Sequence, residues 1–163
     1  GYGTLIRGFS ALNKEMPNTK LVIVGRGHLK RRLMRLAKSL GVGEDITIES
    51  SLSFAELAQL YRSSDLVVYP SFYEGQGLIP LEAMASGVPV VTVDHGPLPE
   101  MVDESVGALF TMGNIESMVS VMKEVLKAGR KKGEKGRARV LQKFTYSGNA
   151  ESFEKVYIEA IKR

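Results

Sequence analysis

The sequence contains no cysteine and, among its 163 residues, only two histidines, His28 and His95. The lack of thiols excludes disulfide bonds and thiolate metal ligands, and two histidines are too few for an ordinary metal centre. We therefore expect no metal and no bound cofactor, so that any chemistry must come from carboxylates, basic groups and the backbone. Both histidines are expected at the surface or in turns, although His95 could approach a cleft.

Long hydrophobic runs are also absent. No apolar stretch approaches the roughly 18 residues that a membrane-spanning helix needs, and no charged-then-apolar leader opens the chain. A hydrophobic content of 44% and a charged content of 25% are typical of a globular protein, and no linker, repeat or low-complexity tract divides the chain. We expect a single domain over residues 1–163 that is cytoplasmic and that could associate peripherally with a membrane in the full-length protein.

The net charge of +4 is modest but unevenly distributed. Five Lys or Arg residues lie between Lys30 and Lys38, and seven lie between Lys127 and Arg139. Such clusters could attract nucleic acid, anionic lipid or an anionic substrate. No RNA-binding aromatic pattern accompanies them, so we interpret them as solvated helix faces and expect no nucleic-acid partner.

Helical and strand patterns alternate along the whole chain, which is typical of a parallel sheet with helices on both faces. The predicted fold class is therefore α/β and Rossmann-like. Ser53 and Glu56 form a capping-box signature at one helix start. Because the chain begins with a helix and with Gly1 rather than Met, we expect a fragment of a longer protein. Strands are predicted at residues 21–24, 46–48, 66–69, 88–93 and 107–110, and apolar helical stripes at 5–16, 29–40, 54–61, 79–85, 115–126, around 140–141 and at 153–161.

The most informative segment is PSFYEGQGLIPLEAMASGVPVV, which starts at Pro70. It places two carboxylates, Glu74 and Glu82, eight residues apart around a glycine-rich turn between a strand end and a helix start. In an open α/β sheet, ligands bind at that position, and the amides of a helix N-terminus attract phosphate. Each carboxylate could accept hydrogen bonds from both hydroxyls of a vicinal diol. Phosphate on the amides and diols on the carboxylates together describe a nucleotide sugar. The alternative for each glutamate alone is a solvated loop or helix residue.

This segment resembles the nucleotide-sugar segment of the retaining glycosyltransferases of family 4, which have the GT-B fold. In that family two glutamates spaced in this way lead into a Glu-Ala-Met-Ala-x-Gly-x-Pro-Val-Val run, as they do here from Glu82 to Val91. Three flanking segments, at 21–27, 57–71 and 96–102, resemble the family's other motifs, with Ser64 where the family has Ala.

The resemblance implies that the chain is the C-terminal, donor-binding half of a GT-B enzyme that transfers a hexose without a metal. It implies that Glu82 binds the ribose of the donor and that Glu74, the catalytic candidate, contacts the transferred sugar. It places Gln76 beside the sugar pocket and lets the amides of Gly77, Leu78 and Ile79 bind the diphosphate. Gly75 and Gly77, which lack a Cβ, let the backbone come close to the ligand. The acceptor-binding N-terminal domain of the same polypeptide and an upstream Arg and Lys would then lie outside this chain. The fragment alone is therefore expected to be inactive, and the acceptor stays unidentified.

A second group of candidate donor-binding residues is Gly25, Arg26, Gly27 and Ser51. Gly25-Arg26-Gly27 follows a predicted strand and precedes a helix, so it could border the same cleft, with a purely structural turn as the alternative. Ser51 follows the strand at 46–48, near where the family places the nucleotide base.

Two positions depart from the family pattern. Gln76 stands where Phe is common, and Pro97 where a glycine is usual. Gln76 adds hydrogen-bonding groups beside the expected sugar pocket, and Pro97 removes an N–H group and restricts its turn.

Two other functions stay open at this point. The chain could be a non-catalytic nucleotide-sugar-binding or interaction module that kept the fold and lost transfer. It could also belong to a sugar-nucleotide epimerase of the same fold, although the Glu-Ala-Met-Ala run resembles family 4 more closely. Fold alone would not decide among these, since Rossmann-like sheets support many chemistries.

Overall fold

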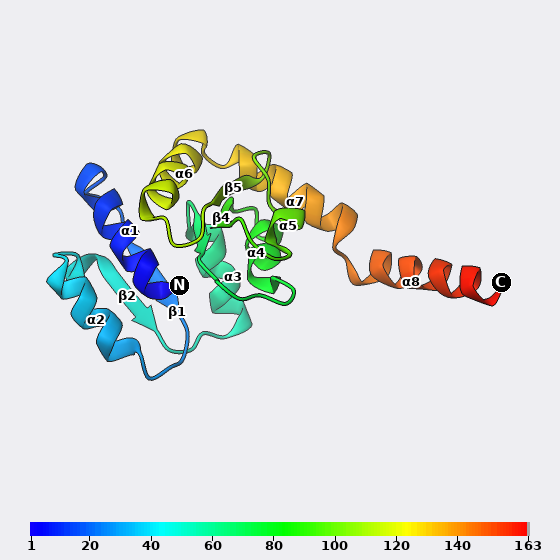
Figure 1. Ribbon diagram of the computed structural model, residues 1–163, viewed down its shortest axis with the longest axis horizontal. Helices are drawn as coiled ribbons and strands as arrows, with labels where there is room; N and C mark the ends of the chain where they lie inside the picture. Colours follow the sequence, from blue (N-terminus) through cyan, green and yellow to red (C-terminus); the bar gives the residue numbers. More distant parts are fainter. Residues whose placement is uncertain (163) are drawn as a thin grey trace.

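A computed structural model of the chain describes residues 1–162 (Figure 1). Five parallel strands alternate with helices along the chain, so the predicted α/β class is confirmed. The strands are β1 (Leu21–Val24), β2 (Ile46–Glu49), β3 (Val67–Tyr69), β4 (Val90–Val93) and β5 (Gly107–Phe110). The helices are α1 (Tyr2–Glu15), α2 (Lys30–Ser39), η1 (Gly43–Asp45), α3 (Phe54–Ser63), α4 (Leu78–Ala85), α5 (Leu98–Met101), α6 (Ile115–Ala128), α7 (Lys131–Lys143) and α8 (Tyr146–Ile161).

The strands are divided between two sheets. β1 pairs with β2, in a register that sets Leu21 opposite Ile46, and β3, β4 and β5 form a second sheet with β4 at its centre. Helix α1 packs against both α2 and α6 and so connects the two sheets. Its Ile6 and Phe9 belong to the core of the first sheet, while Leu5 and Leu12 belong to the core of the second.

Strand β4 is buried on both faces. Val91 and Val93 pack in the core beneath α1 and α6, whereas Val90 packs in a separate core with residues of α4 and α7. This follows from the two-residue period of a strand, which turns successive side chains to opposite faces. The helices therefore cover both faces of the larger sheet, as the uninterrupted apolar run Val88–Val91 of the sequence favours.

Local signals in the sequence set most element ends. The capping box is present, since the Ser53 amide donates to Glu56 Oε2 at 2.7 Å and the Glu56 amide donates to Ser53 Oγ at 3.3 Å. Strands β3 and β4 begin one and two residues later than predicted. Helix α5 was not predicted, because its four residues are too short to show a helical period and contain Pro99.

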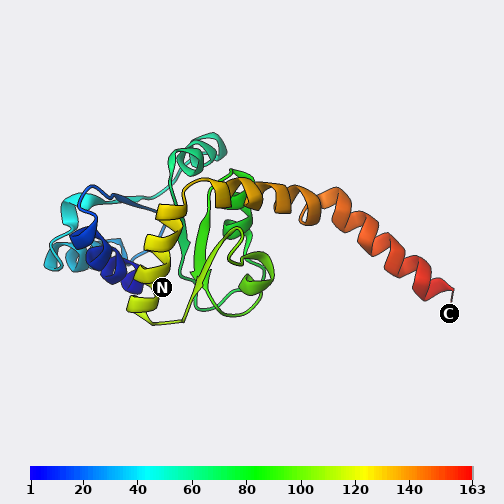
Figure 2. The same cartoon turned by 90° about the horizontal axis from the view of Figure 1, so that it is seen from above.

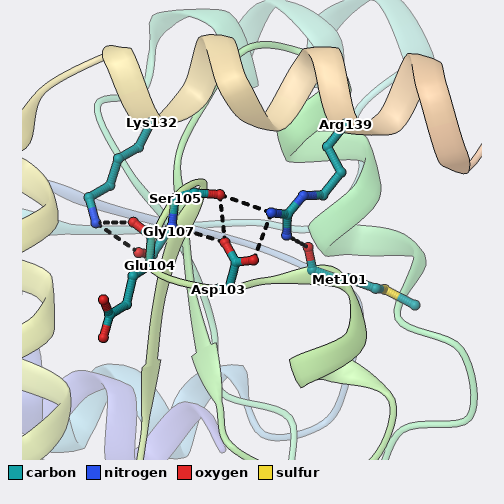
Figure 3. Close-up of polar contacts among 7 residues, drawn as sticks. All are labelled: Met101, Asp103, Glu104, Ser105, Gly107, Lys132 and Arg139. Carbon is teal, nitrogen blue, oxygen red and sulfur yellow. Dashed lines mark hydrogen bonds and ion pairs between the residues drawn. The ribbon is translucent and has the colours of Figure 1, made fainter.

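Helix α7 holds the loop between α5 and β5 through its basic side chains (Figure 3). Arg139 donates to the Met101 carbonyl at 3.0 Å and to Asp103 Oδ2 at 2.7 Å. Lys132 donates to the carbonyls of Glu104, at 2.6 Å, and Gly107, at 3.1 Å. The second basic cluster of the sequence therefore does more than face water, because these cations bind carbonyl groups of a neighbouring loop.

This network predicts a loss of stability in acid. The Ser105 hydroxyl and then Arg139 lower the pKa of Asp103 to about 2, from an ordinary value of 3.8. A carboxylate with a depressed pKa stabilises the fold fully above its unfolded-state pKa, and this stabilisation is lost as the pH falls from about 4 towards 2. Since the Asp103 side chain is 53% exposed, solvent screening keeps the effect small. In urea unfolding between pH 2 and 6, wild type should exceed Asp103→Asn in stability at pH 6, and the difference should vanish near pH 2. A difference that does not change with pH would contradict this assignment.

Helix α8 extends away from the rest of the molecule in both views (Figures 1 and 2). Its predicted apolar stripe is exposed and includes Phe153, Val156, Tyr157 and Ile161. Phe153 and Tyr157 stack on each other with ring centroids 6.3 Å apart. Within residues 1–162, none of the helices is long and apolar enough to cross a bilayer.

Candidate functional site

The candidate residues follow the carboxyl ends of the strands. Parallel strands bring these ends to one edge of a sheet, where the loops after them can meet. The N-terminal end of α1, together with its N-cap residue Gly1, contacts two of these loops. Gly1 packs directly against the Pro70 carbonyl, and the Tyr2 hydroxyl lies 3.9 Å from the point where a Cβ of Gly25 would be. The loop after β1 and the loop after β3 therefore share a neighbour.

Gly77 makes the turn from the loop into α4. Its φ of +77° is in the left-handed region, which disfavours side chains, and it is the N-cap residue of the helix. A Cβ there would also lie 2.9 Å from Leu98 Cδ2 and 3.3 Å from Met101 Sδ, two side chains of α5. Helix α5, held in turn by Arg139 through the Met101 carbonyl, thus supports the underside of the turn.

The Glu74 carboxylate is held by four donors. Its Oε1 accepts the amides of Gly75 at 3.1 Å, Gln76 at 3.3 Å and Gly77 at 3.1 Å, and its Oε2 accepts the Tyr69 hydroxyl. The family resemblance predicts that the Gly77 amide binds a diphosphate. In this structure the same amide donates to Glu74 instead. These hydrogen bonds of Glu74 cannot be predicted from the sequence, because a glutamate side chain in a loop can adopt many rotamers.

The electrostatics agree with an ionised Glu74 and a neutral Tyr69. The Tyr69 hydroxyl and then the Gly77 amide lower the pKa of the Glu74 carboxyl, because they bind its charged form. Burial, and then the hydrogen bond to Glu74, raise the pKa of Tyr69 to about 12. Tyr69 therefore stays protonated and donates to a carboxylate across the physiological pH range.

Glu82 lies on the exposed side of α4, the helix that follows the loop of Glu74. Its Oε2 accepts a hydrogen bond of 3.1 Å from the Tyr61 hydroxyl of α3. Burial first, and the neighbouring Glu82 charge second, raise the pKa of Tyr61. Each glutamate of the pair thus accepts a hydrogen bond from a tyrosine of another element. Sequence analysis missed both tyrosines, since each reads as one more member of an apolar strand or helix stripe.

The amides of Leu78 and Ile79 lie in the first turn of α4, where a helix leaves its N–H groups without internal partners. Within residues 1–162 neither amide donates a hydrogen bond to another group. Both side chains are exposed, and so is Gln76, whose side-chain amide makes no hydrogen bond in the described chain. The end of the loop and the first turn of α4 thus present hydrogen-bond donors without partners to a ligand.

The second candidate group comes together at the ends of β1 and β2. Arg26 donates from Nη2 to Ser51 Oγ at 2.9 Å and from Nε to the Ser50 carbonyl at 3.3 Å. Lys30 donates to the Ile48 carbonyl at 2.7 Å. Gly25, Arg26, Gly27 and Ser51 are all exposed. The structure thus joins Arg26 to Ser51, while no hydrogen bond within residues 1–162 joins this group to Glu74 or Glu82.

Two surface hollows lie away from these residues. One of about 320 Å³ lies between α1 and α2, and one of about 270 Å³ lies between α1 and α6. Neither hollow is lined by Glu74, by Glu82 or by another residue of the loop after β3. Among residues 1–162, no group of three or more His, Cys, Asp or Glu side chains is arranged to hold a metal ion.

The known proteins that this chain resembles are glycosyltransferases. The family model described as "Glycosyl transferases group 1" matches residues 1–140. A GDP-mannose-dependent alpha-(1-6)-phosphatidylinositol monomannoside mannosyltransferase of Mycolicibacterium smegmatis is 31% identical over 134 residues, which are 77% of this chain and 35% of that protein. The chain thus spans about a third of the length of this curated relative.

Two solved structures share the fold. Sucrose-phosphate synthase from Thermosynechococcus elongatus superimposes with a TM-score of 0.85 at 25% identity, over 99% of this chain and 42% of that one. The C-terminal domain of a glycosyl transferase group 1 family protein from Francisella tularensis superimposes with a TM-score of 0.81 at 26% identity, over 90% of this chain and 80% of that one. The chain has the α/β fold of GT-B glycosyltransferases.

Proposed function

Because the chain belongs to the glycosyl transferases group 1 family, we propose that it is the C-terminal, donor-binding domain of a family 4 enzyme that transfers a hexose with retention. The observation that carries this proposal is the arrangement around the turn into α4. One ionised carboxylate is fixed in the loop, a second projects from the helix, and unpaired amides lie between them.

The donor would lie along this turn. Its diphosphate would bind the Leu78 and Ile79 amides at the positive end of α4. Its ribose diol would bind Glu82, and its sugar would lie beside Glu74, Gly75 and Gln76. The base would then extend towards Arg26 and Ser51. Glu74 already accepts four hydrogen bonds, but three of them go to Oε1, and within the described chain only one donor binds Oε2, which has a second lone pair. That oxygen is free to accept a sugar hydroxyl.

The chemistry this site supports is stabilisation of a departing diphosphate. Backbone amides at a helix start are donors that need no reorganisation as negative charge develops on the leaving group. Glu74 would orient the sugar and favour positive charge at its anomeric carbon. Because four donors hold its carboxylate, Glu74 is suited to orientation rather than to nucleophilic attack. We propose no metal in this step, and the upstream Arg and Lys would supply the remaining positive charge.

We propose that the partner of this chain is a further domain of the same polypeptide. Two exposed apolar parts of the structure support this proposal. The stripe of α8 faces solvent along a helix that leaves the body of the chain. On β1, Val22 is 42% exposed, and among residues 1–162 that strand pairs only with β2 and contains no charge or proline to protect its other edge. An acceptor-binding domain of a cytoplasmic enzyme would cover the stripe and complete the cleft.

Nucleotide titration tests the proposal. We expect UDP, GDP or ADP, added at millimolar concentration to isotope-labelled protein, to shift the amide signals of Leu78, Ile79 and Glu82, with one nucleotide preferred. Amides of α8 serve as the internal control and should not move. The complete polypeptide should bind the same nucleotide more tightly and hydrolyse the corresponding nucleotide sugar slowly. Nucleotide binding without any donor turnover would favour the non-catalytic module, and a complete polypeptide that binds none of the three would refute the donor site.

A further inference from the structure

The two glutamates of the site are held by two tyrosines that belong to neither the loop nor α4. Tyr69 is the last residue of β3 and donates to Glu74, and Tyr61 lies in α3 and donates to Glu82. We propose that both are positioning residues with separable effects, Tyr69 on the transfer step and Tyr61 on nucleotide binding. This inference rests on the proposed function and deepens it.

Tyr69 ties Glu74 to the sheet. The other donors to Glu74 are the amides of Gly75, Gln76 and Gly77, which belong to the same loop and would move with it. Within residues 1–162, the Tyr69 hydroxyl is the only donor to Glu74 from outside that loop. Without this hydroxyl, the loop and its carboxylate could shift together relative to the sheet.

The backbone of Tyr69 is itself well fixed. It stands opposite Thr92 of β4 in the parallel ladder, and the fully buried Thr92 hydroxyl donates to the Tyr69 carbonyl at 2.9 Å. The Tyr69 ring packs against the core formed by β4, β5, α1 and α6. A well-anchored strand end therefore presents a single hydroxyl to the carboxylate of a surface loop, which is an arrangement that pre-orients a reacting group.

Tyr61 has the same role for Glu82 in a different place. Its ring packs against the core formed by α4 and α7, while Glu82 is exposed and has no other hydrogen-bond partner in the described chain. A free glutamate side chain on a helix surface samples many rotamers, and ordering it on binding weakens affinity. The Tyr61 hydroxyl selects one orientation before the ribose arrives.

Phenylalanine variants test the two roles, because they remove each hydroxyl and keep the ring in its core. The matched control is Tyr73→Phe, a tyrosine of the same loop that is 93% exposed and whose hydroxyl makes no hydrogen bond in the described chain. Each variant would be made in the complete polypeptide. The measurements are the Kd for UDP and GDP, kcat and KM for hydrolysis of UDP-glucose and GDP-mannose, and the Tm.

The two variants should affect different quantities, kcat in one case and the nucleotide Kd in the other. For Tyr69→Phe we expect kcat to fall about 10- to 100-fold, as for loss of a hydrogen bond to a charged group, with an unchanged nucleotide Kd. For Tyr61→Phe we expect the nucleotide Kd to rise about 2- to 10-fold with kcat nearly unchanged. Tyr73→Phe should match wild type in Kd, kcat, KM and Tm.

The inference and the proposed function fail in different ways. If wild type binds and hydrolyses a donor but Tyr69→Phe and Tyr61→Phe behave like Tyr73→Phe, the positioning roles are wrong and the donor site stands. Equal losses of kcat and affinity in both variants, with a lowered Tm, would show that the tyrosines serve only the fold. If wild type neither binds nor hydrolyses any donor, the proposed function itself is wrong.

Discussion

Glu82→Ala is expected to weaken nucleoside diphosphate binding by about 100-fold without unfolding the protein. A carboxylate that accepts both hydroxyls of a ribose makes two charge-assisted hydrogen bonds, each worth about 1.5–3 kcal/mol, of which water recovers part in the variant. The stability should hardly change, because Glu82 is exposed and, within the described chain, its loss removes only one solvent-exposed hydrogen bond, the one from the Tyr61 hydroxyl. Titration calorimetry with the preferred nucleotide measures the affinity, and thermal unfolding checks the fold.

Two further variants make this result specific. Glu82→Gln keeps the volume and one acceptor oxygen, so its affinity should lie between those of wild type and Glu82→Ala. Glu116→Ala removes another exposed glutamate of a helix, in the first turn of α6, and should bind like wild type. Wild-type affinity in Glu82→Ala would remove Glu82 from the ribose site.

Gly133→Ala is expected to destabilise the protein by about 1–2 kcal/mol. Gly133 lies inside α7, where alanine alone would favour the helix by about 1 kcal/mol. A Cβ there would, however, lie 2.1 Å from the Gly87 carbonyl oxygen and 3.1 Å from Pro89 Cδ. The obstacle is backbone of the turn that leads from α4 into β4, which cannot rotate aside as a side chain can. Overpacking of this kind costs about 1–3 kcal/mol, and lifting α7 off α4 would also loosen the core they share.

The matched control is Gly3→Ala in α1. Apart from its chain neighbours and the backbone of its own helix, no atom of residues 1–162 lies within 4 Å of the Cβ position of Gly3, so the same substitution in a helix should be neutral or stabilising by up to about 1 kcal/mol. Urea unfolding of the two variants measures the difference directly. A Gly133→Ala variant as stable as wild type would mean that α7 does not pack against Gly87 as closely as described.

Much of this fold follows from local sequence. The alternation of apolar strands with helical stripes determined the α/β class, and the Ser53 capping box determined the start of α3. Gly41 and Gly87, both with φ close to +78°, end α2 and α4 where the sequence predicts. These signals are legible because each depends on residues only a few positions apart. For the same reason, the candidate loop could be placed between a strand end and a helix start.

The side-chain partners of the site residues could not be predicted in this way. The sequence alone determined that two glutamates flank a glycine-rich turn, but only the tertiary structure decided what holds them. Tyr61 is 21 positions from Glu82 in the chain, and their contact exists because Tyr61 of α3 packs against the core that α4 helps to form. Likewise, the basic residues of α7 look like a solvated face in sequence, yet Arg139 reaches a carbonyl 38 positions away. Side-chain partners of this kind depend on how helices pack on a sheet, and packing of distant elements leaves no periodic trace in the sequence.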